Sequence, residues 1–153
     1  VLQVTGLRPG RYALRIDGVD IQTYSSDELA SGVNLAGETK TPQYRQALEV
    51  LGLMKTRTKL VASTLRSLAH VEHQSAPELA HPVTLEQMKP YLERRLERFK
   101  ANPGAPSTEQ GVRNYPVIKA REAESLAEAN RLIEQARRVA MPRPHEFALS
   151  PVE

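Results

Sequence analysis

Three histidines lie near one another in the middle of this chain of 153 residues. His70 and His73 are one helical turn apart, and His81 follows a short way on. Imidazole is a common zinc ligand, and three of them can hold zinc with an open fourth position. No regular pattern fixes the third ring, and no nearby aspartate supplies the hydrogen bond that orients a metal-binding imidazole. We therefore expect exposed histidines without a metal, and zinc binding is the alternative.

A second candidate is the segment Glu78-Leu-Ala-His81, in which a carboxylate precedes an imidazole at a spacing that an acid–base pair can use. Such a pair needs a nucleophile, and the chain contains no Cys. It also lacks the Gly-Xaa-Ser-Xaa-Gly elbow, the glycine-rich phosphate loops and the His-Glu-Xaa-Xaa-His zinc motif. We therefore expect no catalytic residue, no cofactor-binding residue and no metal ligand in this chain.

Charged residues offer a third candidate, because Arg94, Arg95 and Arg98 alternate with Glu93 and Glu97. This mixture predicts a solvated helix face. Over the whole chain, 21 Lys and Arg face 18 Asp and Glu, and only 5% of residues are aromatic. A nucleic-acid surface gathers basic residues on one face and interleaves aromatic ones, so we expect no nucleic-acid partner. No apolar run approaches the roughly 18 residues of a membrane span, and we expect no membrane partner.

The elements that position these residues begin with a β meander. Apolar residues alternate with polar ones over residues 2–4, 12–16 and 19–24, which predicts three antiparallel strands. Pro9-Gly10 and Asp17-Gly18 are typical of the turns between them. Asp17 and Asp20 flank the second turn, and we interpret both as turn residues. Ser25 and Glu28 then form a predicted capping box of a short helix that Gly32 ends.

The central part of the chain predicts three main helices. The first begins at Thr41-Pro42 and carries apolar residues at steps of three and four up to residue 68. A polar stretch covers about residues 70–82. The second helix has an apolar stripe from Leu85 to Phe99, in which Pro90 either kinks the helix or marks its true beginning. A turn-rich loop spans residues 102–106, and the third helix runs from Tyr115 to about residue 139. We expect these helices to form an arm and to bury about ten apolar side chains between them.

The end of the chain predicts a last short strand over residues 145–149, after the prolines at 142 and 144. A terminal strand needs an edge, so we expect it to join the amino-terminal meander. The predicted fold class is α+β, with a meander and capped loop over residues 1–40, a helical arm over 41–140 and a strand or tail over 141–153. We expect these parts to form one structural unit. The chain starts at Val1 inside a strand pattern, and small sheets are marginal alone. We therefore expect it to be a fragment of a larger protein.

Two blocks carry a resemblance to a known family. Residues 2–18 and 27–36 resemble the carboxy-terminal region of bacterial GDSL-type, or SGNH, hydrolases, and residues 138–149 are similar to it more weakly. Residues 45–137 match only as helical sequence. The resemblance implies an esterase or acylhydrolase with a flavodoxin-like core, in which Ser, His and Asp cooperate in acyl transfer. The family's Gly-Asp-Ser and Asp-Xaa-Xaa-His blocks are absent here, and Asn34 does not correspond to its oxyanion asparagine.

We therefore expect a non-catalytic carboxy-terminal portion of an SGNH-type serine esterase. Its partner would be an upstream catalytic domain, and its substrate in the whole protein would be an acyl or acetyl ester, with carbohydrate as one carrier. The resemblance also implies a secreted or periplasmic protein. The alternative is a self-contained structural or binding module, without enzyme activity, for a protein or glycan partner.

Overall fold

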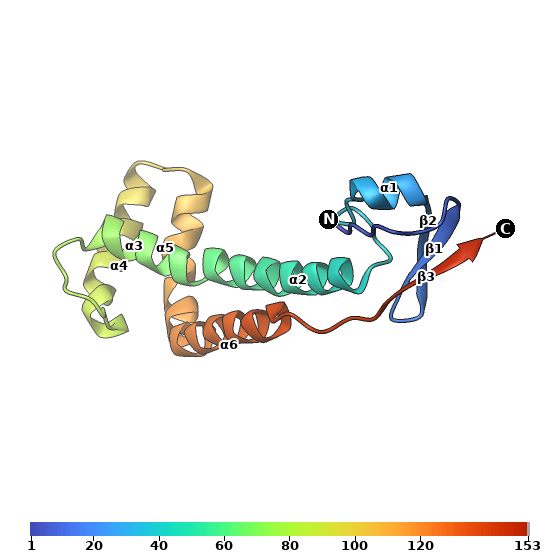
Figure 1. The fold of residues 1–153 in the computed structure, drawn as a ribbon. Helices are drawn as coiled ribbons and strands as arrows, with labels where there is room; N and C mark the ends of the chain where they lie inside the picture. Colours follow the sequence, from blue (N-terminus) through green and yellow to red (C-terminus); the bar gives the residue numbers. More distant parts are fainter. Residues whose placement is uncertain (153) are drawn as a thin grey trace. The chain divides into compact units, whose positions relative to one another are not determined.

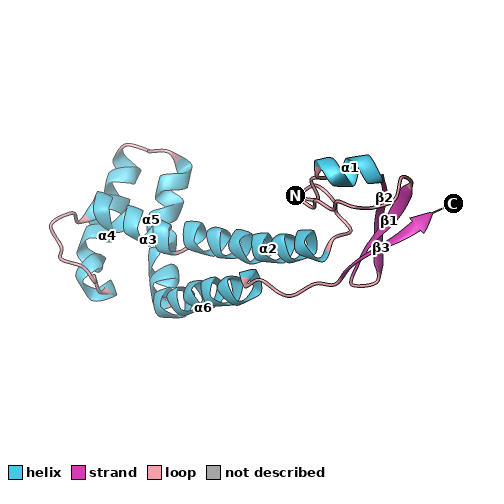
Figure 2. Ribbon diagram, in the orientation of Figure 1, coloured by secondary structure: helices cyan, strands magenta, loops and turns pink. Residues whose placement is uncertain are grey.

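The computed structural model describes residues 1–152, and the fold is α+β, as expected. The chain divides into two compact units. The β unit contains Val1–Leu53 together with the residues from Gln135 onward, and the helical unit contains Met54–Glu134. Figures 1 and 2 show the order of their strands and helices.

The β unit is built on a three-stranded antiparallel sheet (Figure 1). Strand β1 (Arg11–Ile16) lies in the centre, between β2 (Val19–Ser25) and β3 (Phe147–Val152). Tyr12 pairs with Tyr24 on one side of β1, and Leu14 pairs with Leu149 on the other. The prediction that both ends of the chain meet in one small sheet is therefore confirmed.

The strand predicted over residues 2–4 is wrong. Leu2 forms only an isolated bridge, in which its N–H donates to the carbonyl of Val33 at 2.8 Å, and the N–H of Val4 donates to the carbonyl of Leu29 at 2.9 Å. The reason is that β2 and β3 occupy both edges of β1. The first residues instead lie along helix α1 (Ser26–Ser31) and the segment after it.

Helix α1 has the predicted capping box. The N–H of Glu28 donates to the Ser25 hydroxyl at 3.2 Å, and the N–H of Ser25 donates to the Glu28 carboxylate at 2.7 Å. Gly32 ends the helix at a φ of 95°, a conformation that glycine adopts without strain. The hydrophobic core cluster of this unit comes from β1, β2 and α1, and its buried members are Tyr12, Leu14, Ile16, Ile21, Tyr24 and Leu29.

Helix α2 (Pro42–Ser63) starts as predicted, because the N–H of Tyr44 donates to the Thr41 hydroxyl at 3.2 Å. It ends at Ser63, earlier than expected, and buries none of its residues. Leu48 is 50% exposed. In the β unit the residues of α2 next to Ala140 are mostly short or polar, and they leave a hollow of about 320 Å³. The predicted burial of the apolar stripe is therefore wrong for this helix.

The helical unit contains the last part of α2, all of α3 (Leu65–Ser75), α4 (Leu85–Ala101) and α5 (Pro106–Ala120), and the first part of α6 (Glu122–Ala140). Helix α4 begins before Pro90, at a capping box of Thr84 and Gln87. The predicted third helix is two helices that meet at Arg121. Helix α5 starts inside the predicted loop, since Pro106 at the first helical position lacks an N–H that would be unpaired anyway. The stretch read as polar is helical up to Ser75.

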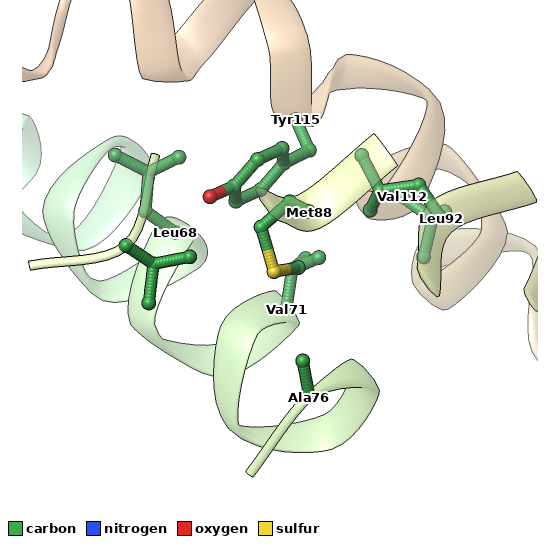
Figure 3. Close-up of a cluster of buried hydrophobic side chains, with 8 residues drawn as sticks. Leu68, Val71, Ala76, Met88, Leu92, Val112 and Tyr115 are labelled. Carbon is green, nitrogen blue, oxygen red and sulfur yellow. The ribbon is translucent and has the colours of Figure 1, made fainter. Parts of the chain in front are cut away.

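Side chains from α3, α4, α5 and the loop between α3 and α4 form the core of the helical unit (Figure 3). Tyr115 and Met88 are fully buried at its centre. The other buried members are Leu68, Val71, Ala76, Val83, Leu92 and Val112. Loops join α3 to α4 and α4 to α5, as Figure 2 shows. Along residues 1–152, every helix is too short or too polar to cross a bilayer.

Candidate functional site

The three histidines near the centre of the sequence are not brought together. His70 and His73 lie on α3, and both are exposed. His81 lies in the loop before α4, with its Nδ1 atom 3.3 Å from the Glu72 carboxylate. Within residues 1–152, no three His, Cys, Asp or Glu side chains are placed to hold a metal ion.

A buried charged cluster lies between α3 and α5. The Glu72 carboxylate is only 5% exposed and accepts a hydrogen bond from the Tyr115 hydroxyl at 2.6 Å. The Lys119 ammonium lies 2.9 Å from the same carboxylate and 2.8 Å from Glu122. Ionised groups tolerate burial when they are paired and hydrogen-bonded in this way.

The charge states of Tyr115 and Lys119 are fixed near neutral pH. Burial raises the pKa of the Tyr115 hydroxyl, and the hydrogen bond to Glu72 raises it further. Burial opposes the charge of Lys119, but its hydrogen bonds to Glu122 and Glu72 raise its pKa overall. Tyr115 is therefore a hydrogen-bond donor and Lys119 a cation. The raised pKa of each group does not suit it to proton transfer near pH 7. The cluster joins α3 to α5.

A carboxylate–imidazole pair joins the two ends of the chain in the β unit. Nδ1 of His145 lies 2.7 Å from a carboxylate oxygen of Asp17, and the other oxygen accepts the N–H of Glu146 at 2.9 Å. The hydrogen bond to His145 lowers the pKa of Asp17, and the one to Glu146 adds to this effect. Asp17 adopts a φ of 52° in the β1–β2 turn. Asp17 is thus a turn residue, as the sequence indicates. Its contacts with His145 and Glu146 also hold the residues just before β3.

The other sequence candidates have separate partners. The Glu78 carboxylate is hydrogen-bonded to its own backbone N–H and to the Tyr91 hydroxyl, which lower its pKa in that order, while His81 lies against Glu72. Asp20 forms an exposed ion pair with Arg15 at 2.5 Å. The side-chain oxygen of Asn34 accepts the N–H of Ala36 at 3.0 Å, which is the loop-capping geometry.

Two hollows lie on the helical unit. One, of about 430 Å³, is lined by residues of α2, α3, α4 and α5, among them His70 and Arg66. The other, of about 480 Å³, we call the arginine hollow; it is lined by Gln74, Ser75, Tyr91, Arg94, Arg95, Arg98, Phe99, Ala101 and Asn102. Arg95 and Gln74 contribute to both.

Sequence reasoning placed the arginines on a solvated face and did not single out Glu72, Tyr115 or Lys119. One signal was available for the arginine hollow: Tyr91, Arg94, Arg95 and Arg98 have the spacing of one helix face. The partners of Glu72 had no comparable signal, because they lie on a helix far along the chain and meet it only through packing.

Comparison with known proteins adds one match. No model of a protein family matches the chain, and a search of curated proteins finds no significant match. A solved structure described as "a gut microbial diltiazem-metabolizing enzyme" is similar over 99% of this chain, with 29% identity and a TM-score of 0.74. The match covers 33% of that enzyme's chain, so the present chain spans about a third of its length. The chain thus has the fold of one part of an enzyme.

Proposed function

We propose that this chain is the non-catalytic carboxy-terminal portion of an SGNH-type ester hydrolase. The observation that carries the proposal is the match of nearly the whole chain to only 33% of a larger enzyme. The resemblance of residues 2–18 and 27–36 to the SGNH family supports the choice of this family. In this proposal an upstream catalytic domain is the partner and supplies the nucleophilic Ser, the oxyanion hole and the Asp–His pair.

The groups found in the chain are consistent with a supporting role. The buried carboxylate of Glu72 is held by Tyr115 and Lys119, whose charge states are fixed, and His145 fastens a strand. Helix α2 leaves Leu48 and Leu51 about half exposed. We assign this apolar stripe of α2 to the contact with the catalytic domain, because the similar enzyme contains much more chain than the part matched here.

The proposed substrate is an acyl or acetyl ester. The similar structure is described as a diltiazem-metabolizing enzyme. Diltiazem itself carries an acetate ester. Hydrolysis of such an ester is the acyl-transfer chemistry for which a Ser nucleophile and an oxyanion hole are suited. Diltiazem and 4-nitrophenyl acetate are therefore suitable test substrates for the whole protein.

The test compares this chain with the complete product of its gene. We expect the complete protein to release acetate from both substrates, and a Ser→Ala variant in its Gly-Asp-Ser block to lose this activity. Residues 1–153 alone should show no turnover above a heat-treated sample. Turnover by this chain alone, or an upstream sequence without the Gly-Asp-Ser and Asp-Xaa-Xaa-His blocks, would contradict the proposal.

One observation favours the alternative of a self-contained binding module. Each unit forms its hydrophobic core from residues of this chain, six in the β unit and eight in the helical unit. For this alternative, the chain expressed alone should be folded and monomeric. A catalytic-domain contact through α2 predicts instead that Leu48→Ser and Leu51→Ser weaken association between separately expressed parts, while an exposed polar control, Glu49→Gln, does not.

A further inference from the structure

The arginine hollow is a pocket of about 480 Å³ on the helical unit. We propose that it binds a small organic anion, with a carboxylate, sulfate or phosphate group against Arg95 and Arg98 and a flat apolar body beside Tyr91 and Phe99. This proposal does not depend on ester hydrolysis. It holds equally if the chain is a self-contained binding module.

Helix α4 separates its arginines from its glutamates, although the two alternate in the sequence. Arg94, Arg95 and Arg98 all line the hollow, whereas Glu93 and Glu97 are not among its lining residues. Glu97 instead forms an ion pair with Lys100 at 2.6 Å. One face of α4 is therefore cationic where the hollow opens, although the sequence of the helix is mixed in charge.

The positive charge of the hollow is only partly compensated. Arg95 donates to two neutral partners, the Ser75 hydroxyl at 2.8 Å and the Gln74 side-chain carbonyl. In the part of the chain described, residues 1–152, no carboxylate forms an ion pair with Arg95 or Arg98. Burial lowers the pKa of Arg95, and the nearby charge of Arg98 lowers it further. An anion between these two guanidinium groups would relieve their repulsion and accept charge-assisted hydrogen bonds.

Arg94 differs from the other two arginines. It lies over the ring of Tyr91, 5.4 Å from the centroid, and it is near the Glu78 carboxylate that Tyr91 contacts. Its charge is thus partly offset within the protein. We therefore place the anionic group of the ligand at Arg95 and Arg98 and regard Arg94 as part of the wall.

Two aromatic rings favour a ligand with a flat apolar part. Tyr91 and Phe99 both line the hollow, and the guanidinium of Arg95 lies 5.9 Å from the centre of the Phe99 ring. A Cβ atom at Gly104 would lie 2.8 Å from the Phe99 ring, so glycine lets the following loop approach this ring closely. The loop after α4 thus packs against the Phe99 ring at the hollow. A volume of this size is within the usual range for small-molecule sites.

The charge pattern favours a small anion over a nucleic acid or other polyanion. A polyanion needs a basic track that extends over several phosphate or sulfate groups. On α4, however, Lys89 and Lys100 outside the hollow are paired with Glu86 and Glu97. On α4, the arginines without a carboxylate partner are therefore those of the hollow.

The experiment is a titration of residues 1–153 with phenyl phosphate. Binding is measured by calorimetry and by changes in the NMR chemical shifts of α4 residues. We expect saturable one-to-one binding, weaker binding of inorganic phosphate and none of phenol. Arg98→Gln should lower the affinity for phenyl phosphate about tenfold or more, because a charge-assisted hydrogen bond is lost. Phe99→Leu should reduce the preference for phenyl phosphate over inorganic phosphate.

The matched control is Lys100→Gln, which removes the same charge from the same helix outside the hollow. We expect its affinity to stay within about twofold of the original, since an exposed distant charge is screened by salt. Melting curves establish that each variant is folded. The proposal is overturned if phenyl phosphate does not saturate, if Lys100→Gln weakens binding as much as Arg98→Gln, or if a sulfated polysaccharide binds through Arg98 while phenyl phosphate does not.

Discussion

The β unit and the helical unit bury different kinds of side chain. In the β unit, the buried residues of the sheet and α1 are aliphatic or tyrosine, and its Arg15–Asp20 ion pair is exposed. In the helical unit, an apolar core of similar character lies beside a buried carboxylate, Glu72, with its partners Tyr115 and Lys119.

The two units therefore depend on different interactions. The β unit relies on hydrophobic burial and on pairing between segments at opposite ends of the chain, β1 and β3. The helical unit also relies on a charged group that burial would penalise if it lost its partners. Single substitutions should therefore affect the two units in ways that separate measurements can distinguish.

The largest expected effect comes from Glu72→Ala. It leaves the buried Tyr115 hydroxyl without its acceptor and removes one of the two carboxylates at Lys119. We expect the free energy of unfolding to fall by about 4 kcal/mol, as when one partner of a buried pair is removed. Urea denaturation followed by circular dichroism measures this change.

The control for that substitution is Glu122→Ala, which removes the other, more exposed partner of Lys119. We expect a loss of no more than about 1 kcal/mol, as for surface ion pairs. Equal losses for the two variants would mean that burial of Glu72 does not distinguish the helical unit, and the comparison between the units would fail.

Leu14→Ala tests the β unit in the same way. Leu14 is 1% exposed in the central strand, and its truncation should lower the free energy of unfolding by about 3 kcal/mol through lost burial and the cavity left behind. Native-state hydrogen exchange should show faster exchange in β1, β2 and β3 with little change in α5. Equal acceleration in α5 would show that the two units unfold together.

The two capping boxes provide a closely matched pair of smaller changes, one in each unit. Ser25→Ala removes the acceptor at the start of α1, and Thr84→Ala removes it at the start of α4. Each should lower the free energy of unfolding by about 1 kcal/mol. Ser26→Ala, next to the first cap, is the control and should change stability much less. We expect each variant to accelerate hydrogen exchange only in its own unit, and acceleration in both units would contradict separate unfolding.

The smallest effect concerns pH. The pKa of Asp17 is lower in the folded protein than its ordinary value of 3.8, so its contribution to stability is present above that value and is lost as pH falls through the folded pKa. Asp17→Asn keeps a residue type that tolerates the φ of 52° and removes the charge. We expect the melting temperature of the original protein to exceed that of the variant at pH 6, and the difference to shrink below pH 3.8. A difference that does not change with pH would contradict this assignment.

Local sequence signals predicted the elements whose causes are local. The capping box at Ser25, the start of α2 at Thr41 and the turn at Asp17 each depend on a few neighbouring residues. The pairing of the terminal strand with β1 followed from one further argument, that a last strand needs an edge.

Features that depend on distant residues were not predictable in the same way. The strand expected over residues 2–4 did not form because β3 occupies the edge of β1 that it would have used. The polar stretch after His70 is helical because Val71 and Glu72 are buried against residues of α4 and α5. Neither the buried partners of Glu72 nor the hollow beside Arg98 could be located without the packing of these helices.

The position of β3 has a consequence for synthesis on the ribosome. Strand β1 is complete at Ile16, but its second neighbour begins only at Phe147. At usual rates of translation, the nascent chain waits on the order of ten seconds before both sides of β1 can be paired. During that interval one side of β1 is a bare edge, open to chaperones or to wrong pairing partners.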